Sequence, residues 1–159
     1  MEVVEATTGE KVKDGRVLIA PGGKHLTLKR FQNEYRVDVS AGPPVNRHCP
    51  SVDVLYRSVA SIAGADAIGI ILMGMGDDGA RGMKVLHDAG AITFAQSEAS
   101  CVVYGMPKEA VAYGGVTQSC SLSEMNEWIR NLAWIFQNNL KIDCVYFIFN
   151  LGLKNQIPL

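Results

Sequence analysis

The feature that most constrains the fold is an apolar run, Ala67-Ile-Gly-Ile-Ile-Leu-Met73, with no charged or polar side chain. Such a run with several β-branched residues is typical of a strand buried on both faces, as strands of parallel sheets are. The run ends in a glycine-rich loop, Gly74-Met-Gly-Asp-Asp-Gly79. After the loop, Met83, Leu86 and Ala89 recur at helical spacing, so the sequence predicts a strand, a tight loop and a helix in that order.

A second apolar segment, Ala91-Ile-Thr-Phe-Ala95, is predicted to be the next strand. Strand, helix and strand form a βαβ unit, whose crossover is almost always right-handed. A second short unit follows, in which a strand at Cys101–Tyr104 leads into a helix from Met106 to Ala112. The sequence therefore predicts an α/β protein with an open, mostly parallel, doubly wound sheet.

The first third of the chain has a different pattern. Residues 1–15 are polar and rich in turn signals, whereas Arg16-Val-Leu-Ile-Ala20 indicates a short buried strand. Residues 26–30 and 35–39 flank a polar tip, and apolar and charged residues alternate in the second of them. This pattern predicts an antiparallel hairpin with one exposed face.

Two further helices have start and stop signals. The first begins after Ser51, a residue that can cap a helix with its hydroxyl, and ends near Gly64. The last begins near Ser121, where Glu124 completes a capping box. The predicted apolar face of this last helix consists of Met125, Trp128, Leu132 and Ile135.

Composition excludes several classes of protein. The 159 residues carry 15 Lys and Arg against 16 Asp and Glu, so no broad basic surface for nucleic acid or anionic lipid is expected. The longest apolar run near the end, Val145–Phe149, is far shorter than the ~20 residues of a membrane span, so no membrane insertion is expected. The polar start does not resemble a signal peptide.

The cysteines are widely spaced, which favours reduced thiols in the cytoplasm over a zinc site or a disulfide scaffold. They are Cys49, Cys101, Cys120 and Cys144.

The glycine loop matches the dinucleotide-binding pattern Gly-x-Gly-x-x-Gly, and Glu98 lies about 20 residues further on. Phosphates bind at such loops because a helix N-terminus presents free N–H groups and a partial positive charge. Asp77 and Asp78 place negative charge at that point, which would repel a pyrophosphate. A dinucleotide-binding domain is therefore the weakest of the functional alternatives.

Asp78 itself has two interpretations that the residues leave open. It is a favourable N-cap for the helix that follows it. Alternatively, its place at the carboxyl end of a strand, where functional groups of open α/β sheets gather, would put a carboxylate at the mouth of a cleft. There it would orient the histidine of a Ser-His-Asp triad, and backbone N–H groups of the loop would form an oxyanion hole.

Several segments, taken in order, resemble one family. Together they are similar to the catalytic domain of the CheB-type chemotaxis protein-glutamate methylesterases, and the resemblance runs from about Glu2 to Trp128. The segments are Ile19-Ala-Pro-Gly-Gly-Lys-His25, Gly42-Pro-Pro-Val-Asn-Arg47, Pro50-Ser-Val-Asp-Val-Leu-Tyr56, Gly74-Met-Gly-Asp-Asp-Gly-Ala80 and Ala95-Gln-Ser-Glu-Ala-Ser-Cys-Val-Val-Tyr-Gly-Met-Pro107.

The resemblance implies hydrolysis of methyl esters on glutamates of methyl-accepting chemotaxis receptors, often with deamidation of receptor glutamines. It also implies a serine nucleophile, a histidine base and an aspartate that fixes the histidine. Asp78 stands at the position of that aspartate, and Met75 at the position of a backbone N–H in the oxyanion hole. The family needs no metal or organic cofactor, and its members carry a phosphorylatable receiver domain as a partner.

The chain departs from the family in ways that affect catalysis. The nucleophilic serine and the catalytic histidine of the family lie upstream of Met1, so the domain is expected to be truncated at its N-terminus. Met73 replaces the threonine that usually precedes the loop. His25 is expected in a turn or at the surface, His48 in a loop, and His87 on a solvent-facing helix position, so none replaces the base.

The chain is accordingly divided into a partial methylesterase domain, residues 1–140, and a divergent apolar tail, residues 141–159. The tail lies outside the resemblance and is either an added strand that covers a sheet edge or non-native sequence from a frame shift, with the second preferred. The chain alone is expected to be inactive. The alternative, from another functional class, is a receptor-binding module without turnover.

Overall fold

The computed structural model describes residues 2–128 and 146–150. The strands are β1 (Glu2–Glu5), β2 (Arg16–Ile19), β3 (His25–Phe31), β4 (Glu34–Ser40), β5 (Ala67–Ile71), β6 (Ile92–Gln96), β7 (Gln118–Cys120) and β8 (Tyr146–Asn150). The helices are α1 (Val52–Ile62), α2 (Ala80–Asp88) and α3 (Met106–Ala112), with 3₁₀ turns at Gly64–Asp66 and Glu98–Ser100. A final helix is described over residues 122–128.

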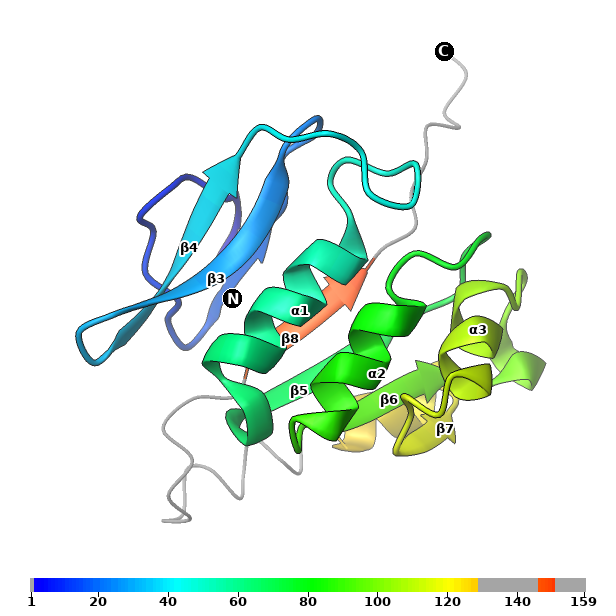
Figure 1. Cartoon of the computed structure of the whole chain (residues 1–159). Coiled ribbons are helices and arrows are strands. Elements are labelled where there is room, and N and C mark those ends of the chain that lie inside the picture. The colour runs from blue at the N-terminus through cyan, green and yellow to red at the C-terminus, as the bar shows by residue number, and fades with distance from the viewer. Residues whose placement is uncertain (1, 129–145, 151–159) are drawn as a thin grey trace.

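The central sheet has the strand order β7-β6-β5-β8, and every neighbouring pair in it is parallel (Figure 1). All residues of β5 are buried, as its uninterrupted apolar sequence predicts. In the β5–β6 pair, Ile68 lies opposite Ile92 and Ile71 opposite Ala95. The carboxyl ends of β5 and β6 therefore lie side by side, and the glycine loop starts at that edge of the sheet.

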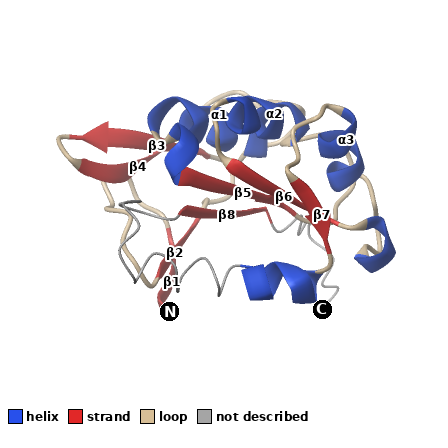
Figure 2. Ribbon diagram, turned by 90° about the horizontal axis from the view of Figure 1, so that it is seen from below, coloured by secondary structure: helices blue, strands red, loops and turns tan. Residues whose placement is uncertain are grey.

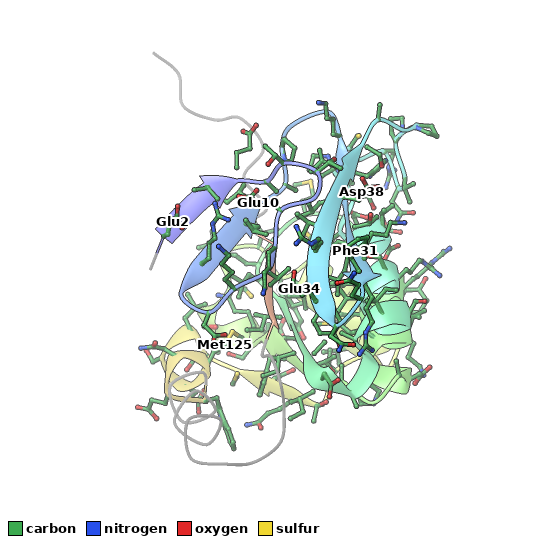
Figure 3. All side chains as sticks on the ribbon, turned by 90° about the vertical axis from the view of Figure 1, so that its left-hand side faces the viewer. Glu2, Glu10, Phe31, Glu34, Asp38 and Met125 are labelled. Carbon is green, nitrogen blue, oxygen red and sulfur yellow. The ribbon has the colours of Figure 1, made fainter. Side chains whose placement is uncertain are left out.

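Helices cover both faces of this sheet. Figure 2 shows α1, α2 and α3 above β5, β6 and β7, and the helix over 122–128 below them. The core under α1, α2 and α3 includes Tyr56, Val59, Ile71, Met83 and Leu86. The opposite core consists of Ile68, Ile70, Phe94, Cys120 and Met125, with Leu72 packed against it. Figure 3 shows Met125 on the sheet-facing side of the final helix. The doubly wound arrangement is thus confirmed.

The capping box at the start of the final helix is also confirmed. The N–H of Ser121 donates to Oε2 of Glu124 at 2.7 Å, and the N–H of Glu124 donates to Oγ of Ser121 at 3.3 Å. Glu124 accordingly has a lowered pKa, caused mainly by the backbone N–H of Ser121. The part of the predicted apolar face at Leu132 and Ile135 lies outside the described residues.

The antiparallel hairpin forms as predicted from β3 and β4, in the register that places Thr27 opposite Asp38. Its buried face lies against α1, where the N–H of Leu28 donates to Oγ of Ser58 at 2.9 Å. The hairpin is a separate two-stranded sheet that lies beside α1, on the side away from α2 (Figure 1).

Three predictions for shorter segments were wrong. Residues 2–5, expected in a polar turn, form β1, which pairs in parallel with β2. Because β1 is the only strand paired with β2 among the described residues, β2 is half-buried rather than buried, and Ile19 is 49% exposed. Cys101–Tyr104 is a loop rather than a strand. It makes only an isolated bridge between Tyr104 and Gly74, and the strand that joins β6 is the unpredicted β7.

Of residues 141–159, the structure describes only 146–150. This segment forms β8, parallel to β5, with Ala67 opposite Tyr146 and Ile71 opposite Asn150. An added strand at the sheet edge was one of the two alternatives for this tail. Within residues 2–128 and 146–150, no helix has the length and apolar character that crossing a membrane requires.

Candidate functional site

The glycine loop after β5 is held against the start of α3. The carbonyl oxygen of Gly74 accepts hydrogen bonds from the N–H groups of Gly105 at 3.1 Å and Met106 at 2.9 Å. A Cβ at position 74 would lie 2.6 Å from Sδ of Met106, and a Cβ at position 105 would lie 2.4 Å from the Gly74 oxygen. Both glycines are therefore required for close packing of the loop on α3.

The other two glycines of the loop have similar explanations. Gly76 and Gly79 have φ values of +100° and +92°, a left-handed conformation that glycine adopts without strain. A Cβ at position 79 would also lie 2.7 Å from Cγ1 of Val52 in α1. The pattern that resembles a dinucleotide fingerprint is thus accounted for by backbone conformation and by packing on α1 and α3.

Asp78 is 3% exposed, and its carboxylate points to the start of α1 rather than to its own helix. Oδ1 accepts from Oγ of Ser51 at 2.7 Å and from Nδ2 of Asn46 at 3.1 Å. Oδ2 accepts from the N–H of Val52 at 2.8 Å. The prediction that Asp78 caps the helix after it was wrong: Gly79 is the N-cap of α2.

Two further expectations at this point are corrected. Ser51 occupies the N-cap position of α1 but makes no cap bond with its own hydroxyl, because that hydroxyl donates to Asp78. Asp78 does not stand at the open mouth of a cleft, because the start of α1 and Asn46 cover its carboxylate. A free N–H group at a helix start is a strong donor to a carboxylate, and this draws Asp78 inward.

A second carboxylate, Asp53, is buried beside the first and is 2% exposed. Its Oδ2 accepts from Nδ2 of Asn46 at 2.5 Å, and its Oδ1 accepts from the N–H of Gly82 in α2. A Cβ at position 82 would lie 2.8 Å from that Oδ1 and 2.9 Å from Cβ of Tyr56. Gly82 therefore lets α1 and α2 approach closely enough for this bond.

The pKa of Tyr56 is affected by the charges of the two carboxylates. Its side chain is fully buried, and its hydroxyl donates to the carbonyl oxygen of Ile70 in β5 at 2.6 Å. Its pKa is strongly raised, first by burial and then by the negative charges of Asp78 and Asp53. The phenol therefore stays protonated and serves as a donor between α1 and the sheet.

Sequence reasoning assigned no role to Asn46 or Asp53, although both lie in segments that carry the family resemblance. Asn46 has a φ of +49°, which asparagine tolerates better than most residues. A polar residue in a proline-bounded loop and an acidic residue in the first turn of a helix were the available signals. Neither signal identifies the more distant partners: Asp78 lies 32 residues from Asn46, and Gly82 lies 29 residues from Asp53.

Met75 lies in the same loop, with its side chain 83% exposed. Among the described residues, no acceptor contacts its backbone N–H. A cleft of about 500 Å³ opens at the next residue, Gly76, and at the start of α3. Its lining residues are Arg47, Gly76, Asp77, Tyr104, Gly105, Lys108 and Glu109.

The charges around this cleft are mixed. Nη2 of Arg47 lies 3.4 Å from Oδ1 of Asp77, and the Arg47 side chain is 82% exposed. Tyr104 has a raised pKa because of burial and, to a smaller extent, the charges of Glu98 and Cys101. The cleft thus combines hydrogen-bonding groups with charges of both signs, a combination that suits a polar substrate.

The three histidines lie away from Asp78, and two of them have other side-chain partners. His25, expected at the surface, is buried, because its Nε2 lies 2.9 Å from the carbonyl oxygen of Pro43 and its Nδ1 accepts from the N–H of Ser51. His87, expected to face solvent, is half-buried, with Nδ1 3.3 Å from Oγ1 of Thr93. His48 is half-buried in its loop. Within residues 2–128, no histidine hydrogen-bonds to Asp78.

Gln96, at the carboxyl end of β6, is 1% exposed: its Oε1 accepts from the N–H of Met73 at 2.9 Å, and its Nε2 donates to the carbonyl oxygen of Ser100 at 2.7 Å. It ties the end of β5 to the loop after β6. In the described part of the chain, no three His, Cys, Asp or Glu residues come together as metal ligands would.

Comparisons with known proteins agree with one another. A family model described as CheB methylesterase matches residues 1–129. A protein-glutamate methylesterase/protein-glutamine glutaminase of Dechloromonas aromatica is 62% identical over 125 residues, which are 79% of this chain and 35% of that protein. A protein of the same name from Hahella chejuensis is 53% identical over 133 residues, 84% of this chain and 36% of that protein.

A solved structure is similar as well. The crystal structure of the Thermotoga maritima CheB methylesterase catalytic domain matches with a TM-score of 0.77 and 34% sequence identity. The match covers 80% of this chain and 68% of that chain. The chain therefore spans about a third of the length of the curated relatives it matches, and about two thirds of the solved domain.

Proposed function

The chain belongs to the CheB methylesterase family, and from this premise we propose that it is part of a hydrolase that demethylates methylated glutamates of chemoreceptors. The extent of the family match, residues 1–129, carries the proposal. The names of the relatives add a protein-glutamine glutaminase activity, and we extend this to the present protein because an ester and a primary amide are hydrolysed by the same acyl transfer.

The proposed reaction is a serine-type acyl transfer. A serine hydroxyl attacks the ester carbonyl, a histidine accepts its proton, and methanol leaves with a proton returned by that histidine. Water then hydrolyses the glutamyl–serine ester. In this scheme the carboxylate of Asp78 orients the histidine, and the N–H of Met75 donates to the oxyanion of the tetrahedral intermediate.

Two observations support these roles. The Met75 N–H has no acceptor among the described residues, and Met75 directly precedes Gly76, which lines the cleft. Asp78 is buried and hydrogen-bonded, which is also the state of the histidine-orienting aspartate of serine proteases. Burial keeps the carboxylate in one orientation, as an orienting role requires.

We further propose that the polypeptide of residues 1–159 has no turnover by itself, because no histidine of the described residues hydrogen-bonds to Asp78. Removal of the serine or histidine from the triad of a serine protease lowers kcat by about a million-fold. The nucleophile and base would come from the part of the family's catalytic domain that this chain does not match. A cytoplasmic location, methyl-accepting receptors and a receiver domain complete the proposal.

The test is reconstitution. The full chain is co-expressed with the part of the Thermotoga maritima domain that it does not match, and methanol release from a glutamyl methyl ester peptide is measured. The chain alone should give the rate of buffer, and the pair should give turnover. Asp78→Asn should lower kcat of the pair by about 10⁴-fold, as the equivalent change does in a serine protease.

Asp66→Asn is the matched control, since Asp66 is exposed and lies in the 3₁₀ turn before β5, at the opposite end of that strand from the glycine loop. Turnover by the chain alone, or full activity of the Asp78→Asn pair, would contradict the proposed mechanism. Capture of chemoreceptor by an assembled but inactive pair would favour the alternative, a receptor-binding module.

A further inference from the structure

The two oxygens of Asp78 are held unequally. Oδ1 accepts from Oγ of Ser51 at 2.7 Å, from Nδ2 of Asn46 at 3.1 Å and, at 3.5 Å, from the N–H of Asp53. Oδ2 accepts only from the N–H of Val52, at 2.8 Å, among the described residues. Since a carboxylate oxygen can accept two hydrogen bonds, Oδ2 has one acceptor position left and Oδ1 has none.

Asn46 is fixed from both sides. Its amide nitrogen donates to Asp78 and also to Oδ2 of Asp53, so its two N–H bonds are divided between two buried carboxylates. Asp53 in turn is held by the N–H of Gly82 in α2. Rotation of the Asn46 side chain would remove one donor from each of two buried carboxylates, which is costly.

Ser51 fixes the carboxylate from the other direction. Ser51 is 2% exposed, and its hydroxyl donates to Oδ1 of Asp78 at 2.7 Å. Because Ser51 and Asn46 both bind Oδ1, the carboxylate plane cannot turn without breaking at least one of these bonds. The hydrogen bonds of Ser51 and Asn46 to Oδ1 therefore also fix the direction of Oδ2.

We propose that Asn46 and Ser51 are positioning residues for the hydrolytic reaction: they hold Oδ1 of Asp78 and thereby present Oδ2 to the ring N–H of the catalytic base. The inference rests on the proposed function, in which Asp78 orients that base. It assigns the catalytic hydrogen bond to one oxygen, Oδ2, and gives the buried network around Oδ1 a role in the rate of the reaction.

The experiment uses the full chain paired with the unmatched part of the Thermotoga maritima domain. Asn46→Gly keeps the left-handed backbone and removes the amide, and Ser51→Ala removes the hydroxyl. Each should lower kcat roughly ten-fold with KM changed less than about two-fold, because a charged hydrogen bond that positions the base acts in the transition state.

Ser58→Ala is the control for a merely structural effect. Ser58 lies on the same helix, and its hydroxyl bonds to the carbonyl oxygen of Leu55 and to the N–H of Leu28 without contacting Asp78. Its loss should lower the melting temperature of the chain and leave kcat unchanged. All assays are run well below the melting temperature of each variant, which is measured by circular dichroism.

The outcomes separate the two proposals. An inactive wild-type pair, or an active Asp78→Asn pair, would overturn the proposed function and the inference with it. A pair that loses activity with Asp78→Asn but keeps full kcat with both Asn46→Gly and Ser51→Ala would overturn the inference alone. The inference would also be overturned if Ser58→Ala lowered kcat as much as Asn46→Gly and Ser51→Ala do. A fall in kcat confined to the Asn46 and Ser51 variants would support it.

Discussion

The close approach of α1 and α2 at Gly82 leads to a prediction that runs against helix propensity. In an ordinary helix, alanine in place of an interior glycine stabilises the protein by about 1 kcal/mol. Here the added Cβ would lie 2.8 Å from Oδ1 and 2.9 Å from Cα of Asp53, and 2.9 Å from Cβ of Tyr56. One of these atoms is backbone, so the two helices have to separate.

The size of the effect follows from three contributions. Overpacking of a well-packed core costs about 1–3 kcal/mol. Separation of the helices also weakens the hydrogen bond from the Gly82 N–H to the buried Asp53 carboxylate, a loss of about 1.5–3 kcal/mol for a charged acceptor. The propensity gain offsets only part of this. Gly82→Ala should therefore lower the free energy of unfolding by about 3 kcal/mol.

The assay is urea unfolding of the full chain, followed by circular dichroism at 222 nm. With a slope of about 2 kcal/mol per molar urea, the midpoint should fall by roughly 1.5 M. Gly22→Ala is the matched control, because a Cβ there meets no atom within 4 Å and its φ is not positive. A Gly82→Ala midpoint equal to or above that of the wild type would refute the argument from close packing.

Three further outcomes are expected. Tyr56→Phe should lower the free energy of unfolding by about 1–2 kcal/mol in the same urea assay, since the buried carbonyl oxygen of Ile70 loses a donor at 2.6 Å; an unchanged midpoint would contradict this. Cys120, 3% exposed and with a thiol pKa raised by burial and then by Glu124, should react with iodoacetamide at about pH 8 far more slowly in the folded than in the urea-unfolded chain, as read by peptide mass spectrometry. Equal rates would argue against its burial. The Ser121 N–H lowers the pKa of Glu124 below its ordinary value of 4.5, so the unfolded chain binds more protons near that pH. Stability should therefore fall as the pH drops below about 4.5, and Glu124→Gln should flatten that fall in melting curves between about pH 3 and 6, whereas an unaltered slope would count against the capping bond.

The elements that sequence patterns predicted are those whose signal is local. The run at 67–73 predicts β5 because a strand buried on both faces needs apolar residues throughout. The capping box of Ser121 and Glu124 lies within four residues and forms as predicted. By contrast, β1 is only four residues long and mostly exposed, and its strand conformation depends on pairing with β2, which no local pattern records.

At the candidate site, too, features with a local sequence signal were predicted and contacts between distant residues were not. The position of Asp78 after a buried strand was visible in the sequence, but its partners were not. Asn46 lies 32 residues away from it and Val52 lies 26 residues away. Asp78 caps a helix that precedes it in the chain, and a capping signal is ordinarily sought in the residues next to a helix. The burial of His25 was missed for the same reason, because its partners Pro43 and Ser51 come from a later loop.

The two hydrogen bonds that hold the Gly74 carbonyl oxygen also affect the N–H of Met75. That carbonyl and the Met75 N–H belong to one peptide plane and point in opposite directions, so fixing one fixes the other. The two bonds from Gly105 and Met106 therefore aim the Met75 N–H. A tilt of α3 would therefore change the direction of the Met75 N–H. A molecule that bound to α3 and tilted it would change this donor without contacting the glycine loop.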